Sequence, residues 1–430
     1  MSDAASGLGP TVFRVEGLPR YAPESEHDRT MRLLLWLVLS FAVLLAAGLA
    51  MRMVGEAGMT NSYALLADAF LHGRLDITQC VDIDCAFYND QYFVVFPPGP
   101  ALIAMPFVAI FGVGFAGFVA LTSVMTAGSM LVWWRILARL RVERMTATWI
   151  LIALAFGTPI YYVTARGDGV WFLAQATGFL FITLALWAAI ERRSLFLIGS
   201  FLAFAFLCRQ LTILIAPFVF ALYLRDDERL FTFRPQRLFD IAKLLLPIAV
   251  AIGAYMIYNY VRFGAPLDTG YAYIGLDSPE RTFIFQRAQE IGLFSPDYFL
   301  FNLFYLFFPG FHVEFAAPLM VDISGMDRMG TSILAASPFV LMAVFVKWRR
   351  PMVVGALTAA AMIGVMLLYH SNGFSQYNVQ RYVLDWLPIV IYALALTIRG
   401  GLRPAFAVLV TYAVGLNLVT AAVAYVTQSS

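Results

Sequence analysis

The sequence is poor in charge and in cysteine. Only 13% of its 430 residues are charged, whereas 61% are apolar and the mean hydropathy is +0.77. Soluble domains carry about 25% charged residues, so the composition excludes an ordinary soluble enzyme and a disordered chain. The 29 basic and 27 acidic residues nearly cancel, which argues against a nucleic-acid partner. Three cysteines are too few for a disulfide scaffold. The composition predicts an integral membrane protein.

Apolar stretches follow one another along almost the whole chain. A membrane-spanning helix needs about 20 apolar residues. The stretch 94–112 is apolar but contains four prolines, and proline breaks helices. Because unpaired backbone is costly in lipid, we expect 94–112 to be a re-entrant or interfacial segment. The remaining stretches predict an all-α polytopic protein with about eleven transmembrane helices, at 32–51, 115–134, 146–163, 170–190, 194–208, 211–224, 243–260, 333–346, 352–369, 383–398 and 405–425.

The distribution of basic residues sets the expected orientation. Cytoplasmic loops collect lysine and arginine. With the N-terminus inside and the C-terminus outside, 20 of the 29 basic residues are cytoplasmic, whereas counting 94–112 as a span would move 16 of them outside. By the same scheme 16 of the 27 acidic residues lie outside. We therefore expect a multi-pass protein of the cell (inner or plasma) membrane whose chemistry takes place on the periplasmic or extracellular side.

This topology divides the chain into four regions. The first and fourth outer loops are large, and we expect an interfacial helix in each, in the fourth at the aromatic run 298–308. The regions are a cytoplasmic tail (1–31), a transmembrane core (32–260) that includes the outer loop 52–114, a large outer loop (261–332) and C-terminal transmembrane helices (333–430).

The first outer loop contains a predicted helix and a cysteine pair. Residues 61–75 begin with a helix-capping asparagine and end near Gly73, which predicts a short amphipathic helix on the membrane surface. On it, Asp68 and His72 are four residues apart, so Asp68 is either half of a solvated pair or a carboxylate directed at a site. Cys80 and Cys85 are either two free thiols or, in an oxidising compartment, a disulfide.

The motifs of this loop resemble those of a known family. They are, in order, Tyr63-x-x-Leu66-Ala67-x-Ala69-x-x-x-Gly73-x-Leu75, Asp84-x-Ala86-x-Tyr88-Asn89-Asp90-x-Tyr92-Phe93 and Phe96-Pro97-Pro98-Gly99-Pro100-Ala101. The loop is similar to the first outer loop of GT-C fold glycosyltransferases that use polyprenyl-phosphate sugars, a group that includes protein mannosyltransferases and lipid A aminoarabinose transferases. Further similar segments are Gly157-Thr158-Pro159 with Asp168-Gly169-Val170-Trp171, Tyr258-Asn259-x-x-Arg262-Phe263-Gly264 with Gly270-Tyr271, and Gln380-Arg381-Tyr382-x-x-Asp385-x-x-Pro388.

The resemblance implies a GT-C-like fold and transfer of a sugar, with inversion, from a polyprenyl-phosphate donor to an acceptor hydroxyl. A carboxylate can take the hydroxyl proton as general base. Many relatives have an acidic residue just before the tyrosine that opens the first-loop helix, but here residues 59–62 are Met-Thr-Asn-Ser. We therefore expect another first-loop carboxylate to be the catalytic base, with Asp84 as first choice and Asp68 as second.

The leaving phosphate requires positive partners, and the arginine fork matches phosphate oxygens. Arg209 interrupts the apolar positions 194–224, where two short spans would meet below the outer surface. A charge there needs a partner, which is either a lipid phosphate or, by snorkelling, the headgroup region. The residues predicted to bind the donor phosphate are Arg209, Arg381 and Arg166, and those predicted to position substrate are Asp168, Trp171, Gln175 and Tyr92.

No cofactor or metal is expected, because His312 and Glu314 lack a third ligand nearby. The expected partners are the lipid-linked donor, membrane lipids and an acceptor polysaccharide, lipid or protein. Two other functions stay open. A transporter or flippase usually holds ionisable groups at mid-membrane and often has inverted repeats, features that this sequence lacks. A non-catalytic assembly protein of GT-C type would explain the missing acid.

Overall fold

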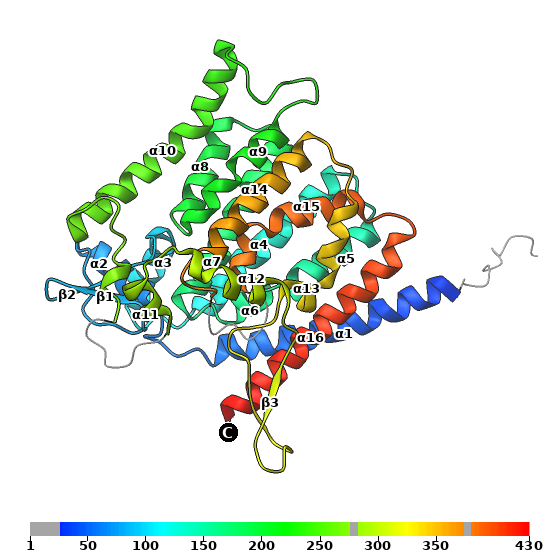
Figure 1. The fold of residues 1–430 in the computed structure, drawn as a ribbon, viewed down its shortest axis with the longest axis horizontal. Coiled ribbons are helices and arrows are strands. Elements are labelled where there is room, and N and C mark those ends of the chain that lie inside the picture. The colour runs from blue at the N-terminus through cyan, green and yellow to red at the C-terminus, as the bar shows by residue number, and fades with distance from the viewer. Residues whose placement is uncertain (1–25, 276–282, 374–379, 430) are drawn as a thin grey trace, which may run out of the picture.

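The computed structural model describes residues 26–275, 283–373 and 380–429, so most of the predicted tail 1–31 lies outside the described residues. The described chain is mostly helical (Figure 1). In it, six helices are long and apolar enough to cross a membrane. They are α1 (Glu26–Val54), α4 (Phe118–Arg139), α7 (Val170–Ile190), α10 (Pro235–Phe263), α14 (Arg350–Leu367) and α16 (Leu402–Ser429). The protein is thus a helical, membrane-type fold with little sheet.

The other predicted spans contain shorter or interrupted helices. Continuous helices were predicted over 146–163, 333–346 and 383–398, and this was wrong in detail, because proline has no amide hydrogen to donate and a new helical segment starts at or next to Pro159, Pro338 and Pro388. The segments are α5 (Arg144–Phe156), α6 (Ile160–Ala165), α8 (Leu195–Phe206), η1 (Gln210–Ile215), α9 (Ala216–Tyr223), α13 (Ile333–Ala336), η4 (Pro338–Phe345), η5 (Arg381–Asp385) and α15 (Leu387–Thr397).

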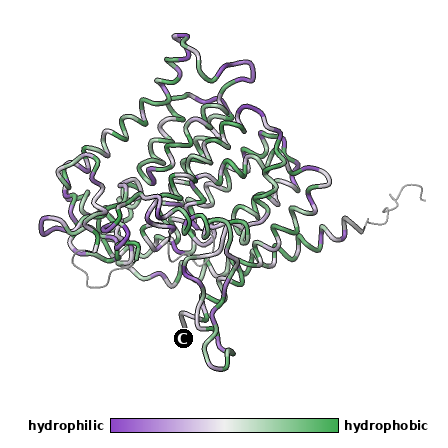
Figure 2. Tube along the Cα trace, in the orientation of Figure 1, coloured by the Kyte–Doolittle hydropathy of each residue, from purple (hydrophilic) through white to green (hydrophobic). Residues whose placement is uncertain are grey.

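The basic loops predicted to be cytoplasmic contact one another at one end of the bundle. Arg403 pairs with Glu143, and Arg139 Nε lies 3.2 Å from Glu191 Oε1. Figure 2 shows apolar residues along the helices and hydrophilic residues concentrated in the connecting loops. These contacts place the loops before α5, after α7 and before α16 side by side, as a common orientation of the spans requires.

At the opposite end of the bundle, two acidic residues connect the end of α1 and the chain after it to neighbouring helices. Arg52 at the end of α1 lies 2.8 Å from Asp168, which precedes α7. The Glu56 carboxylate accepts the backbone N–H groups of Phe118 and Val119, at 2.7 and 2.9 Å, at the start of α4. A carboxylate on the free N–H groups of a helix start is favourable. The chain after α1 is therefore tied to the bundle before the first outer loop begins.

The first outer loop folds as a compact unit of α2 (Ser62–Leu71), β1 (Cys85–Tyr88), β2 (Gln91–Val94) and α3 (Gly99–Phe111). The predicted helix and its cap are confirmed, since Asn61 Oδ1 accepts the N–H of Tyr63. Seven of its ten residues are buried in the protein and it packs on α3. Apolar side chains on several faces of α2 are covered by the rest of the loop.

The hairpin β1–β2 was not part of the all-α prediction. Tyr88 pairs with Gln91, so Asn89 and Asp90 form a two-residue turn in which both residues have positive φ. Asparagine and aspartate tolerate this conformation better than most residues. The strands are only four residues long, so the signal of alternating side chains was too short to be distinguished from loop.

The segment 94–112, predicted to be re-entrant or interfacial, contains α3, whose 13 residues extend about 20 Å. At its start, Gly99 N–H donates to the carbonyl of Leu207 at 2.8 Å. The first outer loop therefore rests directly on the corner between α8 and η1, where Arg209 lies.

The second large outer loop packs against the helical bundle. It contains η2 (Tyr271–Tyr273), α11 (Phe283–Glu290), η3 (Pro296–Tyr298), α12 (Phe299–Phe307), β3 (Val313–Phe315) and β4 (Ile323–Met326). The aromatic run forms α12, whose buried Asn302 donates to carbonyls of Met366 and Leu367 at the end of α14. One face of α12 is therefore attached to the bundle.

Candidate functional site

Two adjoining cavities lie between the first outer loop and the bundle. The small cavity has a volume of about 80 Å³ and is lined by Asp84 and His370 among others. The large cavity has a volume of about 450 Å³, is mostly apolar and is lined by Arg209 and Gln210. Six residues line both: Phe96, Trp171, Tyr271, Tyr369, Arg381 and Tyr382. The two cavities therefore share walls, with a carboxylate in one and a guanidinium in the other.

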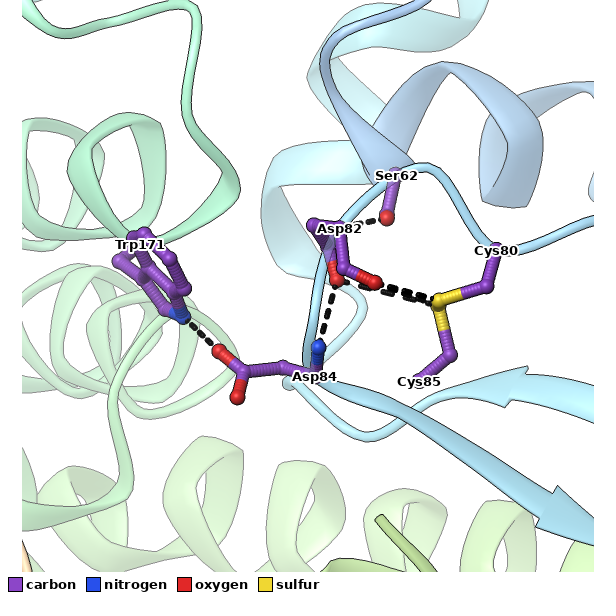
Figure 3. The surroundings of a disulfide bond; sticks show 6 residues. All are labelled: Ser62, Cys80, Asp82, Asp84, Cys85 and Trp171. Atoms are coloured by element: carbon purple, nitrogen blue, oxygen red, sulfur yellow. Dashed lines mark hydrogen bonds between the residues drawn. A yellow bond between two sulfur atoms is a disulfide. The ribbon is translucent and has the colours of Figure 1, made fainter. Parts of the chain in front are cut away.

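Asp84 is the acidic residue of the small cavity. Trp171 Nε1 of α7 donates a hydrogen bond to its Oδ2, and the two side chains point toward each other across the gap between loop and bundle (Figure 3). Asp84 is partly exposed and lines the small cavity. Its enclosure by protein, with a smaller contribution from the charge of Asp82, raises the pKa of Asp84 to about 7. A carboxyl group with this pKa can accept and release a proton near neutral pH.

The segment that carries Asp84 is fixed on the side away from Trp171. Cys80 and Cys85 form a disulfide, which decides between the two possibilities left open by the sequence. Within this loop Asp82 Oδ1 accepts the backbone N–H of Asp84 at 3.0 Å, and Asp82 Oδ2 accepts the hydroxyl of Ser62 at the start of α2 (Figure 3). The position of the Asp84 carboxylate is therefore determined by the disulfide loop, by α2 and by α7 together.

Arg209 has a protein partner that the sequence analysis did not predict. Its Nε lies 2.9 Å from Asp385 Oδ1 and its Nη2 lies 2.8 Å from Asp385 Oδ2, which is a bidentate pair. Gln175 Nε2 donates to the same carboxylate at 2.7 Å. Snorkelling to headgroups is therefore not needed to compensate this charge. The hydrogen bonds of Arg209 to described residues use Nε and Nη2 rather than Nη1, and this residue lines the large cavity.

Arg381 lies where the two cavities meet. Its guanidinium stands 5.6 Å from the ring of Trp171, 5.3 Å from that of Phe172 and 5.1 Å from that of Tyr382. Its Nη1 donates to the carbonyl of Gly373 at 2.8 Å. The aromatic faces stabilise a cation in this position. The arrangement directs positive charge toward both cavities.

Helix α7 contacts both carboxylates of the site, Asp84 and Asp385. Trp171 and Gln175 are four residues apart, so they lie on one face of the helix, one turn from each other. Trp171 binds Asp84 and Gln175 binds Asp385. Both residues were predicted to position substrate, and in the structure they hold the two carboxylates. Of the six long helices, α7 is the most buried, which makes it a rigid support.

The other predicted site residues lie outside both cavities. Asp68 forms the predicted pair with His72, at 3.4 Å, and lies 3.7 Å from Arg74, so it takes the solvated role of the two that the sequence left open. Asp168 pairs with Arg52 and lies 3.9 Å from Arg166. Tyr92 packs against Phe87 with ring centroids 5.1 Å apart.

The sequence analysis missed Asp385, His370 and the tyrosines that line the cavities. Asp385 could have been found, because it starts an apolar stretch that we expected to span the membrane, and a charge there requires a partner. Tyr271, Tyr369 and Tyr382 could not, since single tyrosines near membrane interfaces are common. Their convergence depends on the packing of the two outer loops.

The arrangement combines a group that can accept a proton with groups that can bind negative charge. A carboxyl group with a pKa near 7 can take a proton from a nucleophile, and two arginines can stabilise negative charge a short way along the same walls. The large apolar cavity suits the hydrocarbon part of a lipid, which requires no polar partner. No protein-family model, no curated protein and no solved structure matches this chain, so its functional assignment depends on the sequence motifs and on this geometry.

Proposed function

We propose that the protein is a membrane glycosyltransferase that moves a sugar from a polyprenyl-phosphate donor to an acceptor hydroxyl. The observation that carries the proposal is the pair of adjoining cavities, with Asp84 in the small one and Arg209 in the large apolar one. The order of motifs that resembles GT-C fold enzymes supports the same function.

In the proposed reaction, the acceptor oxygen forms a bond to the anomeric carbon while the bond from this carbon to the phosphate oxygen breaks. Asp84 takes the proton of the attacking hydroxyl. The polyprenyl phosphate leaves with the bonding electrons, and Arg381 and Nη1 of Arg209 stabilise its charge. The polyprenyl chain occupies the large cavity, and attack from the side opposite the phosphate inverts the anomeric configuration.

We also propose an eleven-span topology with the N-terminus inside and the site on the periplasmic or extracellular face of the inner or plasma membrane. Two observations support this side. Disulfides persist in oxidising compartments, and the Cys80–Cys85 disulfide lies next to Asp84. The basic loops contact one another at the opposite end of the bundle, where the positive-inside rule places the cytoplasm.

The decisive experiment compares two substitutions in the same loop. Asp84→Asn removes the base with little change in shape and should lower the rate of sugar transfer about 10²- to 10⁴-fold, the usual contribution of general base catalysis. Asp90→Asn, in the exposed β1–β2 turn, is the matched control and should keep full activity. The assay uses reconstituted protein and synthetic polyprenyl-phosphate sugars.

The same assay discriminates the alternatives. Full activity of Asp84→Asn would exclude Asp84 as the base. Movement of lipid-linked sugar across proteoliposomes without any covalent product would support a flippase instead. If the purified protein binds donor but transfers no sugar with any acceptor class, the assembly role becomes the better explanation.

A further inference from the structure

Asp82 is an acidic residue of the first outer loop that the proposed reaction does not use. It lies within the loop that the Cys80–Cys85 disulfide closes, next to Ser62 of α2 and to the segment that carries Asp84 (Figure 3). Asp82 is half-buried, and it lines neither of the two cavities described above. A role of this carboxylate in the reaction would therefore act through a neighbouring residue.

Both oxygens of the Asp82 carboxylate accept hydrogen bonds from neutral donors. Oδ1 accepts the backbone N–H of Asp84 at 3.0 Å, and Oδ2 accepts the hydroxyl of Ser62. In the described part of the chain, no basic side chain forms an ion pair with this carboxylate. Burial raises the pKa of Asp82, and the two hydrogen bonds act in the opposite direction. A half-buried charge without a cationic partner is costly, so its presence two residues before the proposed base requires an explanation.

The hydrogen bond from Asp84 N–H to Asp82 Oδ1 restricts the backbone that carries the base. An aspartate that accepts the N–H two residues further along the chain forms an Asx turn. The disulfide closes the same short loop, and Ser62 attaches Asp82 to α2, most of which is buried. On the other side, Trp171 donates to the Asp84 carboxylate. Asp82 thus connects the base to the well-packed part of the outer loop.

The charge of Asp82 acts on the same carboxyl group. Burial raises the pKa of Asp84 most, and the neighbouring negative charge of Asp82 raises it further. The hydrogen bond from Trp171 and the positive charge of Arg381 oppose both effects. The other titratable side chains that line the small cavity are Tyr271, Tyr369, Tyr382 and His370.

These other side chains carry no charge near neutral pH. Tyrosine is neutral well above pH 7, and burial lowers the pKa of His370 to about 4, so its imidazole is neutral as well. Asp82 and Arg381 are therefore the charged neighbours that act on Asp84, with opposite signs.

We propose that Asp82 is a positioning residue for sugar transfer: its Oδ1 atom holds the backbone of Asp84, and its carboxylate places a second negative charge beside this base. The inference rests on the proposed function and adds a second acidic residue to it. The hydrogen bond keeps Asp84 at the wall of the small cavity, and the charge keeps it basic enough to take the proton of a hydroxyl group. Asp82 itself makes no contact with the substrate.

Two substitutions separate the charge from the hydrogen bond. The measurement is the pH profile of kcat/KM for reconstituted protein with the synthetic polyprenyl-phosphate sugar that the wild type transfers best. Asp82→Asn keeps an acceptor oxygen for Asp84 N–H but removes the charge. Because loss of a nearby negative charge lowers the pKa of Asp84, the midpoint of the profile should move about one unit to lower pH. The plateau rate should fall only roughly threefold, since a weaker base takes a proton more slowly.

Asp82→Glu makes the opposite change. It keeps the charge, but the additional methylene group displaces the oxygen that accepts the N–H of Asp84. The midpoint should stay near that of the wild type, and the plateau rate should fall about 10- to 100-fold, because a base that is displaced by about 1 Å is much less effective.

Asp90→Asn is the matched control, because it removes a negative charge from the exposed β1–β2 turn of the same loop. It should change neither the midpoint nor the plateau. A purely structural role for Asp82 would lower the plateau in both Asp82 variants and leave both midpoints at the pH of the wild type, and this result would overturn the inference. Thermal unfolding and binding of the donor show whether each variant is folded.

Ser62→Ala keeps the inference testable if Asp82→Asn does not fold. Loss of the hydroxyl removes the hydrogen bond to Asp82 Oδ2, which raises the pKa of Asp82 further, so that less of its charge is present near neutral pH. The midpoint should move to lower pH, as in Asp82→Asn but by a smaller amount. An unchanged midpoint in Ser62→Ala would then overturn the inference.

The two proposals fail in distinguishable ways. If the wild type transfers sugar and Asp84→Asn loses the pH step, but the Asp82 and Ser62 variants keep the midpoint of the wild type, the proposed function stands and the role of Asp82 is wrong. If the wild type transfers no sugar from any donor, the proposed function is wrong and the inference about Asp82 falls with it. Full activity of Asp84→Asn would likewise remove the base on which Asp82 is proposed to act.

Discussion

Asp84, like its neighbour Asp82, is enclosed by protein, and burial raises the pKa of both carboxyl groups. Asp68 and Asp90 remain in contact with solvent, whereas Asp84 lies between the disulfide loop and Trp171. Because enclosure raises its pKa to about 7, only about half of the molecules have the base form at pH 7. The rate should therefore depend on pH within the physiological range.

We expect the rate of sugar transfer to fall about tenfold per pH unit below pH 7 and to level off above it. The sign follows from the role: the general base acts only when deprotonated, and deprotonation is completed as the pH rises through the pKa. A profile of kcat/KM between pH 5 and 9 measures this. The residual rate of Asp84→Asn serves as control and should lack the step, and a flat wild-type profile would contradict the assignment.

Substitutions of Arg209 and Asp385 can test the contribution of this pair to stability separately from its contribution to function. The side chain of Asp385 is 2% exposed and that of Arg209 is 19% exposed, so removal of one partner leaves a charge in an apolar environment. We expect Asp385→Ala to lower the free energy of unfolding by about 3–5 kcal/mol. Thermal unfolding in detergent measures the effect.

The double variant Arg209→Met with Asp385→Leu supplies the comparison. It replaces both charges by apolar groups, which often restores the stability of a protein that has lost one partner of a buried pair. We expect unfolding close to that of the wild type but no sugar transfer, because the phosphate has lost Arg209. An active double variant would show that Arg209 has only a structural role.

At the scale of elements, the contact between α3 and the corner after α8 connects the first outer loop to Arg209. A Cβ atom at Gly99 would lie 2.6 Å from the carbonyl oxygen of Leu207 and 3.1 Å from Cys208 Sγ. Since the first of these atoms belongs to the backbone, the helix or the corner must move. A glycine at this position therefore permits the close approach that brings the loop to the cavity.

Gly99→Ala should destabilise the protein by about 1–3 kcal/mol, the usual cost of overpacking, and should reduce activity by displacing the corner that carries Arg209. Gly114→Ala is the control in the same loop, because a Cβ there would have no neighbouring atom within 4 Å. Unfolding temperature and transfer rate are measured for both. Equal behaviour of the two variants would show that the contact with Leu207 is unimportant.

The elements themselves were predictable to different degrees. The asparagine cap of α2, the break after α8 and the shortness of α3 followed from local residues, namely Asn61, the Arg209-Gln210 pair and the prolines. The burial of α2 did not follow, because its apolar residues could face either lipid or protein. The hairpin β1–β2 has only four-residue strands, which are too short for a periodic signal.

At the scale of the whole molecule, the proposed orientation can be tested by chemical labelling. Asp90→Cys lies in the exposed turn next to the site and Lys347→Cys lies in an exposed basic loop. A membrane-impermeant maleimide should label Asp90→Cys on intact cells and Lys347→Cys only after permeabilisation. The wild type is the background control, since Cys80 and Cys85 are paired and Cys208 is buried. Labelling of both variants from one side would contradict the topology.

Composition and local order were sufficient to establish a helical membrane protein, and they identified Asp84, Arg209, Arg381, Trp171 and Gln175 as candidates. These inferences depend on hydropathy, charge and proline, which act within about 20 residues of chain. The pairing of Arg209 with Asp385 and the walls shared by the two cavities involve residues more than 150 positions apart. Such contacts arise from the packing of helices and loops, and no local property of the chain specifies which distant side chains will meet.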